Sequence, residues 1–455
     1  MAALNTQRLT LKVCIVGAGP AGLAVARAFR AFGIAYEQFE RHLDVGGIWD
    51  IENPGSPMYR SAHFISSKTR SAFHFFPMPE DFAVYPTRLQ VLEYIRSYAR
   101  AFDLHRSIRF GTSVTMASRT ATGWRVTLSD GTEREYSHLV CANGHTWDPI
   151  HPAYPGVFKG QQVHAVQYRD AELFRGKRVL VVGGGNSACD IACDAARSAD
   201  RAWISLRRGY HFIPKTIFGR PTDEFNEGGL RLPLRQRQFV FQCLVRLMTG
   251  DVGRLGLPRP DHRILESHPI INDQLIHHLR HGDIAVKGDI AQLDGEDVVF
   301  KDGSRLAVEL ILFATGYKYS IPYVDHSVFS WTGTKPDLSF GLFNANDDRI
   351  FPIGFTETNA GGYHTLDDAA VLVANCVLEQ TTRSSHWHQT WAILCADPDL
   401  SGGIRFVDSE RHKNYVDNES LLVAMKRLSK RLRWPTALEA LRPPSPDHVF
   451  AWTDR

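Results

Sequence analysis

Two stretches of the chain show the same succession of apolar and polar positions. In the first, residues 11–16 form a short run that is apolar except for Lys12, residues 17–22 read Gly-Ala-Gly-Pro-Ala-Gly, and small residues at helical spacing continue to about Arg30. A second short run follows at 34–39 and closes on Glu40. This order predicts a strand, a glycine turn, a helix and a second strand, which together form one βαβ unit.

The glycine turn of this unit has the spacing of a dinucleotide-binding fingerprint. Gly17 permits a tight turn, Gly19 lets the backbone approach a pyrophosphate, and Gly22 lets the helix lie close to the strand. The start of the predicted helix presents free N–H groups and the positive end of its dipole to that phosphate. Glu40 stands at the end of the second strand, where an acid can bind ribose hydroxyls. The predicted cofactor-binding residues are Gly17, Gly19, Pro20, Ala21, Gly22 and Glu40; the alternative is an ordinary helix–strand turn that happens to be rich in glycine.

The second stretch repeats this pattern with one change of charge. A strand at 178–182, a turn at 183–188, a helix at 189–199 and a strand at 202–206 are followed by two arginines where the first unit has an acid. A carboxylate at that place favours a bare ribose diol, whereas guanidinium favours a 2′-phosphate. We therefore predict FAD at the first unit, NADPH at the second and hydride transfer between them. The predicted NADPH-binding residues are Gly183, Gly185, Asn186, Ser187, Arg207 and Arg208; the alternative for the two arginines is a solvated strand end.

The pattern also predicts elements outside these two units. Residues 87–102 have the spacing of an amphipathic helix, and residues 108–140 alternate as in a small antiparallel sheet. The proline- and aromatic-rich stretch at 57–86 predicts irregular structure. Residues 421–441 predict a basic amphipathic helix, which we expect to pack on the body of the protein or on a partner subunit rather than on a membrane.

Composition and charge restrict the class of protein. A chain of 455 residues exceeds what one hydrophobic core usually supports, so two or more domains are expected. A net charge of +3 gives no reason to expect nucleic acid or an anionic membrane as a partner. No apolar run is long enough to span a bilayer, and residues 1–10 lack the apolar core of a signal peptide. We therefore expect a cytoplasmic protein.

The seven cysteines form no Cys-x-x-Cys pair and no zinc-ligand spacing. A sparse, odd set of thiols is typical of a reducing compartment, and no metal site is predicted. The absence of a paired redox motif also excludes a disulfide reductase of similar layout, which needs two cysteines beside its flavin.

A further motif lies between the two glycine turns. Phe158-x-Gly160-x-x-x-His164-x-x-x-Tyr168 resembles the identifying motif of the flavin-containing monooxygenase family, which are class B flavoprotein monooxygenases related to the Baeyer–Villiger enzymes. The resemblance covers nearly the whole chain, because residues 39–41, 46–49, 76–81, 207–209 and 313–317 also match the family in order. It implies that His164 lies at the domain junction and helps to set the NADPH domain against the flavin.

The resemblance implies an α/β fold of two Rossmann-like dinucleotide-binding domains, for FAD and NADPH, with the second inserted into the first. We expect a first part of the FAD domain at 1–150, an NADPH domain at 151–317, and the rest of the FAD domain with a C-terminal helix at 318–455. A homodimer is one assembly that the family suggests. The resemblance adds as cofactor-binding residues Arg41, Gly47, Ile48, Trp49, Val114, Thr315 and Gly316.

The resemblance also implies an activity. NADPH reduces FAD, the reduced flavin reacts with O2 to form a C4a-hydroperoxide, and a nucleophilic nitrogen or sulfur of a small organic substrate takes the distal oxygen. Alternatives are a Baeyer–Villiger enzyme acting on ketones and a reductase or oxidase that transfers no oxygen. A flavin-binding sensor without activity has little support, since the two arginines would then have no purpose.

One position departs from the family pattern. The family usually has asparagine three residues before the lysine that is Lys68 here, and this chain has Ile65. Isoleucine cannot donate a hydrogen bond to a peroxide or to bound NADP. Either Ser66 takes over this catalytic task or oxygen activation is altered, and Ser66 and Ser67 could equally be ordinary loop residues.

Overall fold

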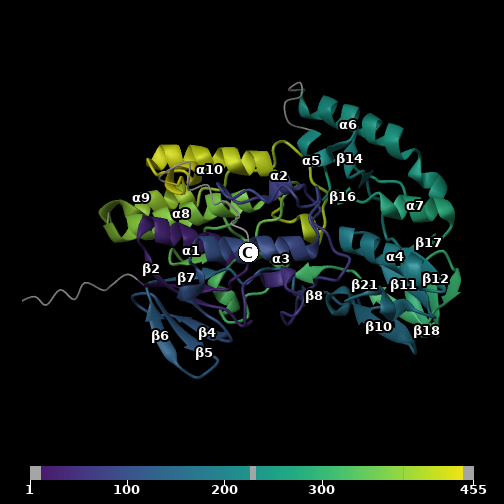
Figure 1. The fold of residues 1–455 in the computed structure, drawn as a ribbon, viewed down its shortest axis with the longest axis horizontal. Helices are drawn as coiled ribbons and strands as arrows, with labels where there is room; N and C mark the ends of the chain where they lie inside the picture. The colour runs from purple at the N-terminus through teal and green to yellow at the C-terminus, as the bar shows by residue number, and fades with distance from the viewer. Residues whose placement is uncertain (1–11, 226–231, 383, 444–455) are drawn as a thin grey trace, which may run out of the picture.

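The computed structural model describes residues 12–225, 232–382 and 384–443, which form two parallel sheets set side by side (Figure 1). The first sheet has the order β25-β7-β1-β2-β3, and all its strands are parallel. Its central β1 is apolar and almost wholly buried, as a strand covered on both faces must be. The strands are β1 (Lys12–Val16), β2 (Ala35–Phe39), β3 (Ile108–Arg109), β7 (His138–Cys141) and β25 (Ile350–Pro352).

The second sheet has the order β10-β21-β11-β12-β17 and is also parallel throughout. All its strands lie in the chain between β7 and β25 of the first sheet, so the second unit is inserted into the first. The strands are β10 (Gln161–His164), β11 (Arg178–Val182), β12 (Arg201–Ser205), β17 (Ile284–Lys287) and β21 (Leu310–Phe313). The strand predicted at 178–182 is therefore observed, and β12 begins one residue earlier than expected.

Helices cover the first sheet and form the largest core of the protein. The helix α1 (Pro20–Phe32) lies against α8 (Tyr363–Thr382), and both contribute buried side chains to this core. Around them lie α3 (Arg88–Ala101), as predicted, and α9 (Trp387–Leu394), α10 (Asn418–Leu432) and α11 (Ala437–Ala440). The single helix predicted at 421–441 is wrong: α10 ends where Arg433 takes the left-handed conformation (φ +57°), and Pro435 precedes α11.

Smaller elements complete both units. An antiparallel sheet, as predicted within 108–140, contains β4 (Val114–Arg119), β5 (Trp124–Leu128) and β6 (Glu133–Tyr136). The second unit has a further sheet of β9 (Gly156–Phe158), β18 (Ile290–Gly295), β19 (Asp297–Phe300) and β20 (Arg305–Ala307), and its helices are α4 (Asn186–Ser198), α5 (Thr222–Phe225), α6 (Leu234–Thr249) and α7 (Gln274–His281). The remaining elements are α2 (Lys68–Ser71), β8 (Asp148–Pro149), β13 (Phe212–Ile213), β14 (Thr216–Ile217), β15 (Arg220–Pro221), β16 (Ile270–Ile271), β22 (Tyr317–Lys318), β23 (Trp331–Thr332) and β24 (Lys335–Pro336).

The two connections between the units are hydrogen-bonded to each other. The linker strand β8 leads into the second unit, β22 leads out of it, and the two pair antiparallel. The N–H of Ile150 donates to the carbonyl of Gly316 (3.0 Å), and Lys318 lies 3.5 Å from the Asp148 carboxylate. The second unit is thus attached through a two-stranded ribbon rather than through two independent loops.

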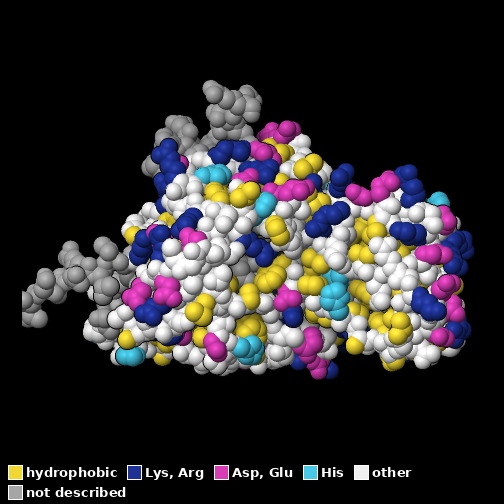
Figure 2. Space-filling view, turned by 90° about the horizontal axis from the view of Figure 1, so that it is seen from below, with side chains coloured by type: hydrophobic (Ala, Val, Ile, Leu, Met, Phe, Trp, Pro, Cys, Tyr) yellow, Lys and Arg dark blue, Asp and Glu magenta, His cyan; other side chains and the backbone are white. Residues whose placement is uncertain are grey.

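The surface carries both signs of charge. Figure 2 shows basic and acidic side chains interspersed over the face seen from below, with no extended region of one sign. Within the described residues, no helix has both the length and the apolar character needed to cross a bilayer.

Candidate dinucleotide sites and their junction

In the first glycine turn, nearby backbone atoms leave no room for a side chain at Gly17 or Gly22. Gly17 has a φ of +106°, and a Cβ atom there would lie 2.5 Å from the carbonyl oxygen of Ala142. Its N–H donates to the carbonyl of Phe39 (2.8 Å), so the turn joins the ends of three strands. A Cβ atom on Gly22 would overlap the carbonyl oxygen of Gly17. The geometry matches the tasks that the fingerprint gives these two glycines, a tight turn and close packing of the helix.

Glu40 holds this turn through its carboxylate. One oxygen accepts from the N–H of Ala18 (2.6 Å) and the other from the N–H of His42 (2.9 Å). The residue is only 6% exposed. Each carboxylate oxygen has a lone pair left, so the group can still accept hydrogen bonds from ribose hydroxyls at the end of β2.

The α1 helix begins with Gly19 as N-cap and Pro20 and Ala21 at its first turn, and no side chain caps its free N–H groups. Gly47 packs against it: a Cβ atom on Gly47, whose φ is +58°, would lie 3.0 Å from the Cα of Gly19. The short helix Gly47–Trp49 includes Ile48, and the Trp49 ring stacks on Phe64 with centroids 5.0 Å apart. Uncapped N–H groups beside a glycine pair fit an anionic diphosphate.

Two further residues predicted at this site lie at its edge. Arg41 is exposed, donates to the carbonyl of Pro54 (2.6 Å) and lies 5.4 Å from the centroid of the Trp147 ring. Val114 is buried in β4, within the same apolar cluster as Val16 and Phe39. Both stand near the end of β2, where the adenosine part of a dinucleotide is expected.

The second glycine turn repeats the first in detail. Gly183 has a φ of +139°, its N–H donates to the carbonyl of Ser205 (3.1 Å), and a Cβ atom there would overlap the Ala314 carbonyl oxygen. Gly185 is the N-cap of α4 with φ −81° and ψ 174°, close to the values of −75° and −176° at Gly19. The second unit therefore has the backbone of a dinucleotide site.

Asn186 and Ser187 begin α4, which starts earlier than the predicted residue 189. The Asn186 side chain accepts from the N–H of Ile271 (2.8 Å) and donates to the carbonyl of Pro269 (3.0 Å). It therefore fixes the loop before α7 to the turn, and any contact with a cofactor comes in addition. Ser187 is exposed at the helix start.

The two arginines after β12 differ in environment. Arg207 is exposed, whereas Arg208 is half-buried with its guanidinium 5.1 Å from the centroid of the Tyr210 ring. The Nε atom of Arg208 is buried without a hydrogen-bond partner, and neither arginine forms a salt bridge with a described residue. An unpaired guanidinium at this strand end fits a 2′-phosphate.

A third arginine near the second turn comes from the far end of the chain. The Nη1 atom of Arg411 lies 3.7 Å from the position that a Cβ atom on Gly185 would occupy. Its Nε atom lies 3.9 Å from Glu357, which also pairs with Lys335 at 3.1 Å. Burial alone would raise the pKa of Glu357, but Arg411 and Lys335 lower it to about 2. A carboxylate flanked by two cations thus holds Arg411 beside the N-terminus of α4.

The segment that carries Arg411, residues 404–417, joins the two units. Val416 donates to the carbonyl of Glu357 (3.1 Å) and Val407 to the carbonyl of Glu266 (2.8 Å). The N–H of His268 donates to Nε2 of His412 (2.9 Å). Sequence reasoning missed this segment, since it lies more than two hundred residues from the turn it covers.

The motif of Phe158, Gly160, His164 and Tyr168, which we call the junction motif, contacts α4. Tyr168 is fully buried and donates to the Asp194 carboxylate of α4 (2.9 Å). On the same face of α4, one turn away, Tyr59 of the first unit donates to Asp190 (3.0 Å), and the Tyr59 and Tyr168 ring centroids lie 5.5 Å apart. A Cβ atom on Gly160 would lie 2.6 Å from the Phe158 ring, which explains glycine two residues after the aromatic. The motif and Tyr59 therefore fix the helix whose N-terminus forms the second turn.

His164 packs against the linker that leads out of the second unit. It is 1% exposed, and its ring lies edge-on to Tyr317 with centroids 5.4 Å apart. Burial, followed by the nearby His151, lowers the pKa of His164 to about 4. Since Nδ1 accepts from the N–H of Val166 (3.1 Å), the proton of the neutral ring is on Nε2. The predicted Thr315 and Gly316 lie in the same linker, bonded to Ile150 rather than to either glycine turn.

The hydroxyl group of Ser66 donates its proton to a neighbouring serine. Its Oγ lies 2.8 Å from Oγ of Ser71, which itself donates to the carbonyl of Ser67 (2.7 Å). Ser66 must therefore be the donor to Ser71. The Lys68 side chain donates to three backbone carbonyls, those of Pro79, Glu80 and Phe82. In this arrangement Ser66 has no second proton for an oxygen species, and its role stays a prediction.

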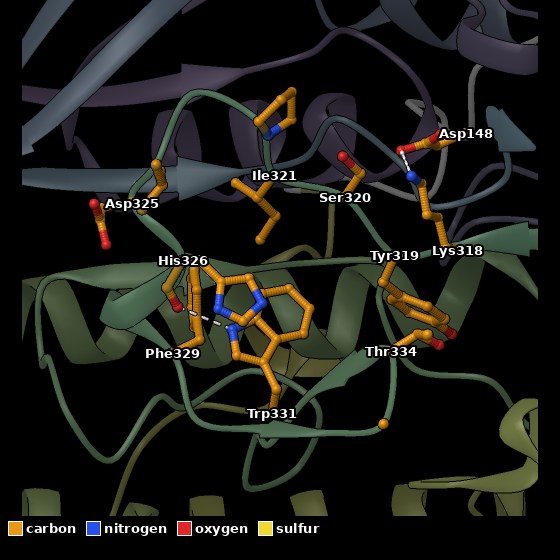
Figure 3. A pocket seen from close by; sticks show the side chains of 13 residues that line it. Asp148, Lys318, Tyr319, Ser320, Ile321, Asp325, His326, Phe329, Trp331 and Thr334 are labelled. Carbon is orange, nitrogen blue, oxygen red and sulfur yellow. Dashed lines mark hydrogen bonds and ion pairs between the residues drawn. The ribbon is translucent and has the colours of Figure 1, made fainter.

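A cavity of about 390 Å³ lies beside the linkers (Figure 3). The Trp331 ring stacks on His326 in one wall (4.4 Å between centroids), and the Asp148–Lys318 pair lies at its edge. None of the predicted cofactor residues lines it, so it is separate from both glycine turns. Its lining residues are Asp148, Lys318, Tyr319, Ser320, Ile321, Pro322, Val324, Asp325, His326, Phe329, Trp331, Gly333 and Thr334.

Among the described residues, no group of three or more His, Cys, Asp or Glu side chains could hold a metal ion.

Comparison with known proteins places the chain in a family. The family described as "Flavin-binding monooxygenase-like" matches residues 10–359. Flavin-containing monooxygenase 5 of Oryctolagus cuniculus is 33% identical over 346 residues, which cover 70% of this chain and 64% of that protein. Dimethylaniline monooxygenase [N-oxide-forming] 2 of Macaca mulatta is 33% identical over 361 residues, 74% of this chain and 67% of that protein. The chain thus spans about two thirds of the length of these relatives.

A solved structure agrees with the fold. An oxidized steroid monooxygenase bound to NADP superposes with a TM-score of 0.72 at 19% identity, over 93% of this chain and 98% of that one. The predicted fold class, two Rossmann-like domains with the second inserted into the first, is confirmed, and so is the resemblance that led to it. The matched region contains both glycine turns and the whole junction motif. This chain belongs to the flavin-binding monooxygenase-like family.

Proposed function

We propose that the protein is an NADPH-dependent FAD monooxygenase that oxygenates a nucleophilic nitrogen or sulfur atom of a small organic substrate, with O2 as the second substrate. The observation that carries this proposal is the pair of matching glycine turns, with a carboxylate behind one and guanidinium groups behind the other. A relative named for N-oxide formation supports nitrogen as the atom that is oxygenated. When bound, NADPH supplies a hydride and FAD passes the electrons to O2.

The residues of the first turn fit FAD. Gly17, Gly19 and Gly22 leave no side chain between the backbone and a diphosphate, and the N–H groups of α1 are uncapped. Glu40 binds the ribose and at the same time fixes the Ala18 N–H. Gly47, Ile48 and Trp49 form the wall beside α1 that the flavin half would follow. We assign the FAD domain to residues 1–150 and 318–455.

The residues of the second turn fit NADPH, and we assign that domain to residues 151–317. The start of α4 binds the diphosphate, Arg207 and Arg208 bind the 2′-phosphate, and Arg411 adds a cation at the diphosphate. Tyr168 and Tyr59 both hold one face of α4 through Asp194 and Asp190, so they orient the nicotinamide end without touching it. His164, buried and neutral at neutral pH, packs against the linker.

The decisive experiment follows the flavin spectrum during two separate half-reactions. The purified protein with its flavin is reduced by NADPH under anaerobic conditions. It is then mixed with buffer that contains isotopically labelled O2 and a tertiary amine or a sulfide. We expect bleaching by NADPH, reoxidation by O2 and one atom of labelled oxygen in the product. NADPH consumption without labelled product would contradict oxygen transfer.

Two alternatives give other products in the same assay. A Baeyer–Villiger enzyme would convert a cyclic ketone to a lactone and leave the amine unchanged. An NADPH oxidase would release hydrogen peroxide in the amount of NADPH consumed. The oxidase alternative is favoured by a specific observation, because Ile65 cannot donate a hydrogen bond and the Ser66 proton is already used by Ser71.

A further inference from the structure

The cavity beside the linkers has the size of a small-molecule site. It is formed by side chains of residues 318–334 together with Asp148 of the linker strand β8 (Figure 3). Its volume of about 390 Å³ lies within the range of about 300–1,000 Å³ that is usual for pockets that hold a small molecule. Since its lining includes no residue of either glycine turn, a ligand bound there would be distinct from both dinucleotides.

The walls of this cavity are aromatic on one side and aliphatic on the other. The Trp331 and His326 rings lie nearly parallel, with centroids 4.4 Å apart, and Phe329 meets the Trp331 ring edge-on at 6.1 Å. The indole N–H of Trp331 donates to the carbonyl of His326 (2.9 Å), which fixes the orientation of the ring. Figure 3 shows Ile321 pointing toward these rings from the opposite wall. Walls of this kind suit a flat aromatic ligand.

The charged side chains of the cavity are in balance acidic. Asp325 lies at one end, and the pair of Asp148 and Lys318 lies at the other (Figure 3). The Ser327 hydroxyl and N–H donate to Asp325 and lower the pKa of its carboxyl group, so it is ionised at neutral pH. The Lys318 ammonium group is neutralised by Asp148 at 3.5 Å. The lining therefore attracts a positive charge more than a negative one.

We propose that this cavity binds a planar aromatic cation, with its ring between Ile321 and the Trp331–His326 pair and its charge attracted by the acidic ends. Aromatic faces attract cations, and tryptophan does so most strongly. The same acidic ends disfavour a carboxylate ligand of similar shape. The site is independent of the proposed oxygenation, because a quaternary aromatic nitrogen has no lone pair that could accept an oxygen atom.

The linker ribbon supplies a cation that competes with such a ligand. Lys318 of β22 pairs with Asp148 of β8, and these are the two strands that connect the units. A bound cation near Asp148 meets a carboxylate that Lys318 already occupies, so the two positive charges compete for it. The ligand thereby contacts both connections between the units, and removal of the Lys318 charge should favour its binding.

The test uses the full chain with its flavin and no NADPH, so that no turnover takes place. Calorimetric titration compares three flat two-ring molecules in mildly alkaline buffer: N-methylquinolinium, which is a cation, quinoline, which is uncharged, and 1-naphthoate, which is an anion. We expect N-methylquinolinium to bind about tenfold more tightly than either of the others. Saturating NADP+ should not displace it, because the cavity is separate from the second glycine turn.

Two substitutions in the linker ribbon should act in opposite directions. Lys318→Met removes the competing charge and should tighten N-methylquinolinium binding up to about fivefold, whereas Asp148→Asn should weaken it by a similar factor. Damage to the fold could only weaken binding, so tighter binding to Lys318→Met has no such explanation. Trp331→Ala should weaken binding about tenfold, and Trp331→Phe, which keeps a ring, should weaken it less. The control is Asp397→Asn, an exposed acid outside the cavity, which should leave binding unaltered.

Three results would overturn the proposal. The first is N-methylquinolinium that fails to bind the wild type, or binds it no more tightly than quinoline or 1-naphthoate. The second is binding that stays the same in Trp331→Ala, Trp331→Phe and Lys318→Met, since the ligand would then lie elsewhere. The third is displacement of N-methylquinolinium by NADP+, which would place the ligand at the nicotinamide position instead. Flavin content and the thermal transition are measured for each variant to show that the fold is intact.

Discussion

Replacing Arg411 by glutamine tests whether the C-terminal segment contributes to the NADPH site. The guanidinium lies 3.7 Å from the position of a Cβ atom on Gly185, at the N-terminus of α4 where the diphosphate is expected. Glutamine keeps much of the length and polarity of the side chain but removes its charge. We expect NADP+ to bind more weakly to the flavin-loaded variant.

The magnitude follows from the exposure of the side chain. A hydrogen bond to a charged group contributes about 1.5–3 kcal/mol. Since 43% of the Arg411 side chain is exposed, water screens the interaction and the lower limit applies. A loss of about 1.4 kcal/mol raises the Kd of NADP+ about tenfold. Stability should decrease only in part, because the Glu357 carboxylate loses one of its two cations but keeps Lys335 at 3.1 Å.

Calorimetric titration separates the diphosphate from the 2′-phosphate. NADP+ and ADP-ribose contain the diphosphate, whereas adenosine 2′-monophosphate does not. Arg411→Gln should weaken the first two ligands and leave the third unchanged. The control is Arg405→Gln, an exposed arginine of the same segment with no contact to the turn. Equal weakening of all three ligands, or no weakening of NADP+, would refute the placement of Arg411 at the diphosphate.

Three further predictions concern the specificity for NADPH, the oxygen step and the pH dependence of stability. Arg207→Ala should raise the KM for NADPH far more than that for NADH in steady-state assays; unchanged values for both would remove Arg207 from the 2′-phosphate site. Ile65→Asn should lower the fraction of NADPH oxidation that ends as hydrogen peroxide, measured with a peroxidase-coupled assay. If this fraction stays constant, residue 65 does not stand at the position that the family resemblance assigns to it. The pKa of Glu357 is lowered in the folded protein from 4.5 to about 2, so its carboxylate stabilises the fold at neutral pH and loses this effect as the pH falls from about 4.5 toward 2. The Tm of the wild type should therefore decrease more steeply than that of Glu357→Gln across this interval, and parallel Tm curves would argue against the two-cation arrangement.

The parts of the fold that were predictable depend on neighbouring residues in the sequence. The backbone at Gly17 and Gly183 is dictated by the strand before each turn and the helix after it, so a short motif determines the local structure. The boundaries of β11 followed from its apolar run alone. The end of α10 was missed because its amphipathic pattern continues beyond Arg433, although Pro435 is a stop signal.

The contacts between the two units were not predictable in the same way. Tyr59 and Asp190 are 131 residues apart, and nothing near either residue indicates the other. Arg411 reaches Gly185 only because segment 404–417 returns from α9 across the junction. A burial pattern shows that a tyrosine lies inside the protein but cannot identify the carboxylate that accepts its proton. Residues of this kind need the tertiary structure, or pairs that vary together among relatives.

The near-identity of the two turns has a consequence for how this chain distinguishes its cofactors. In both units the first glycine donates to the end of the neighbouring strand and lies against a carbonyl of a third strand, and the N-cap glycines differ by only a few degrees in φ. A backbone of the same shape with the same helix dipole cannot favour one diphosphate over another. Selectivity must therefore come from side chains added at the rim, namely Glu40 on one side and Arg207, Arg208 and Arg411 on the other. It follows that changes at these four positions can alter cofactor preference while the turns stay intact, whereas any side chain introduced at Gly17 or Gly183 abolishes binding of whichever cofactor that turn holds.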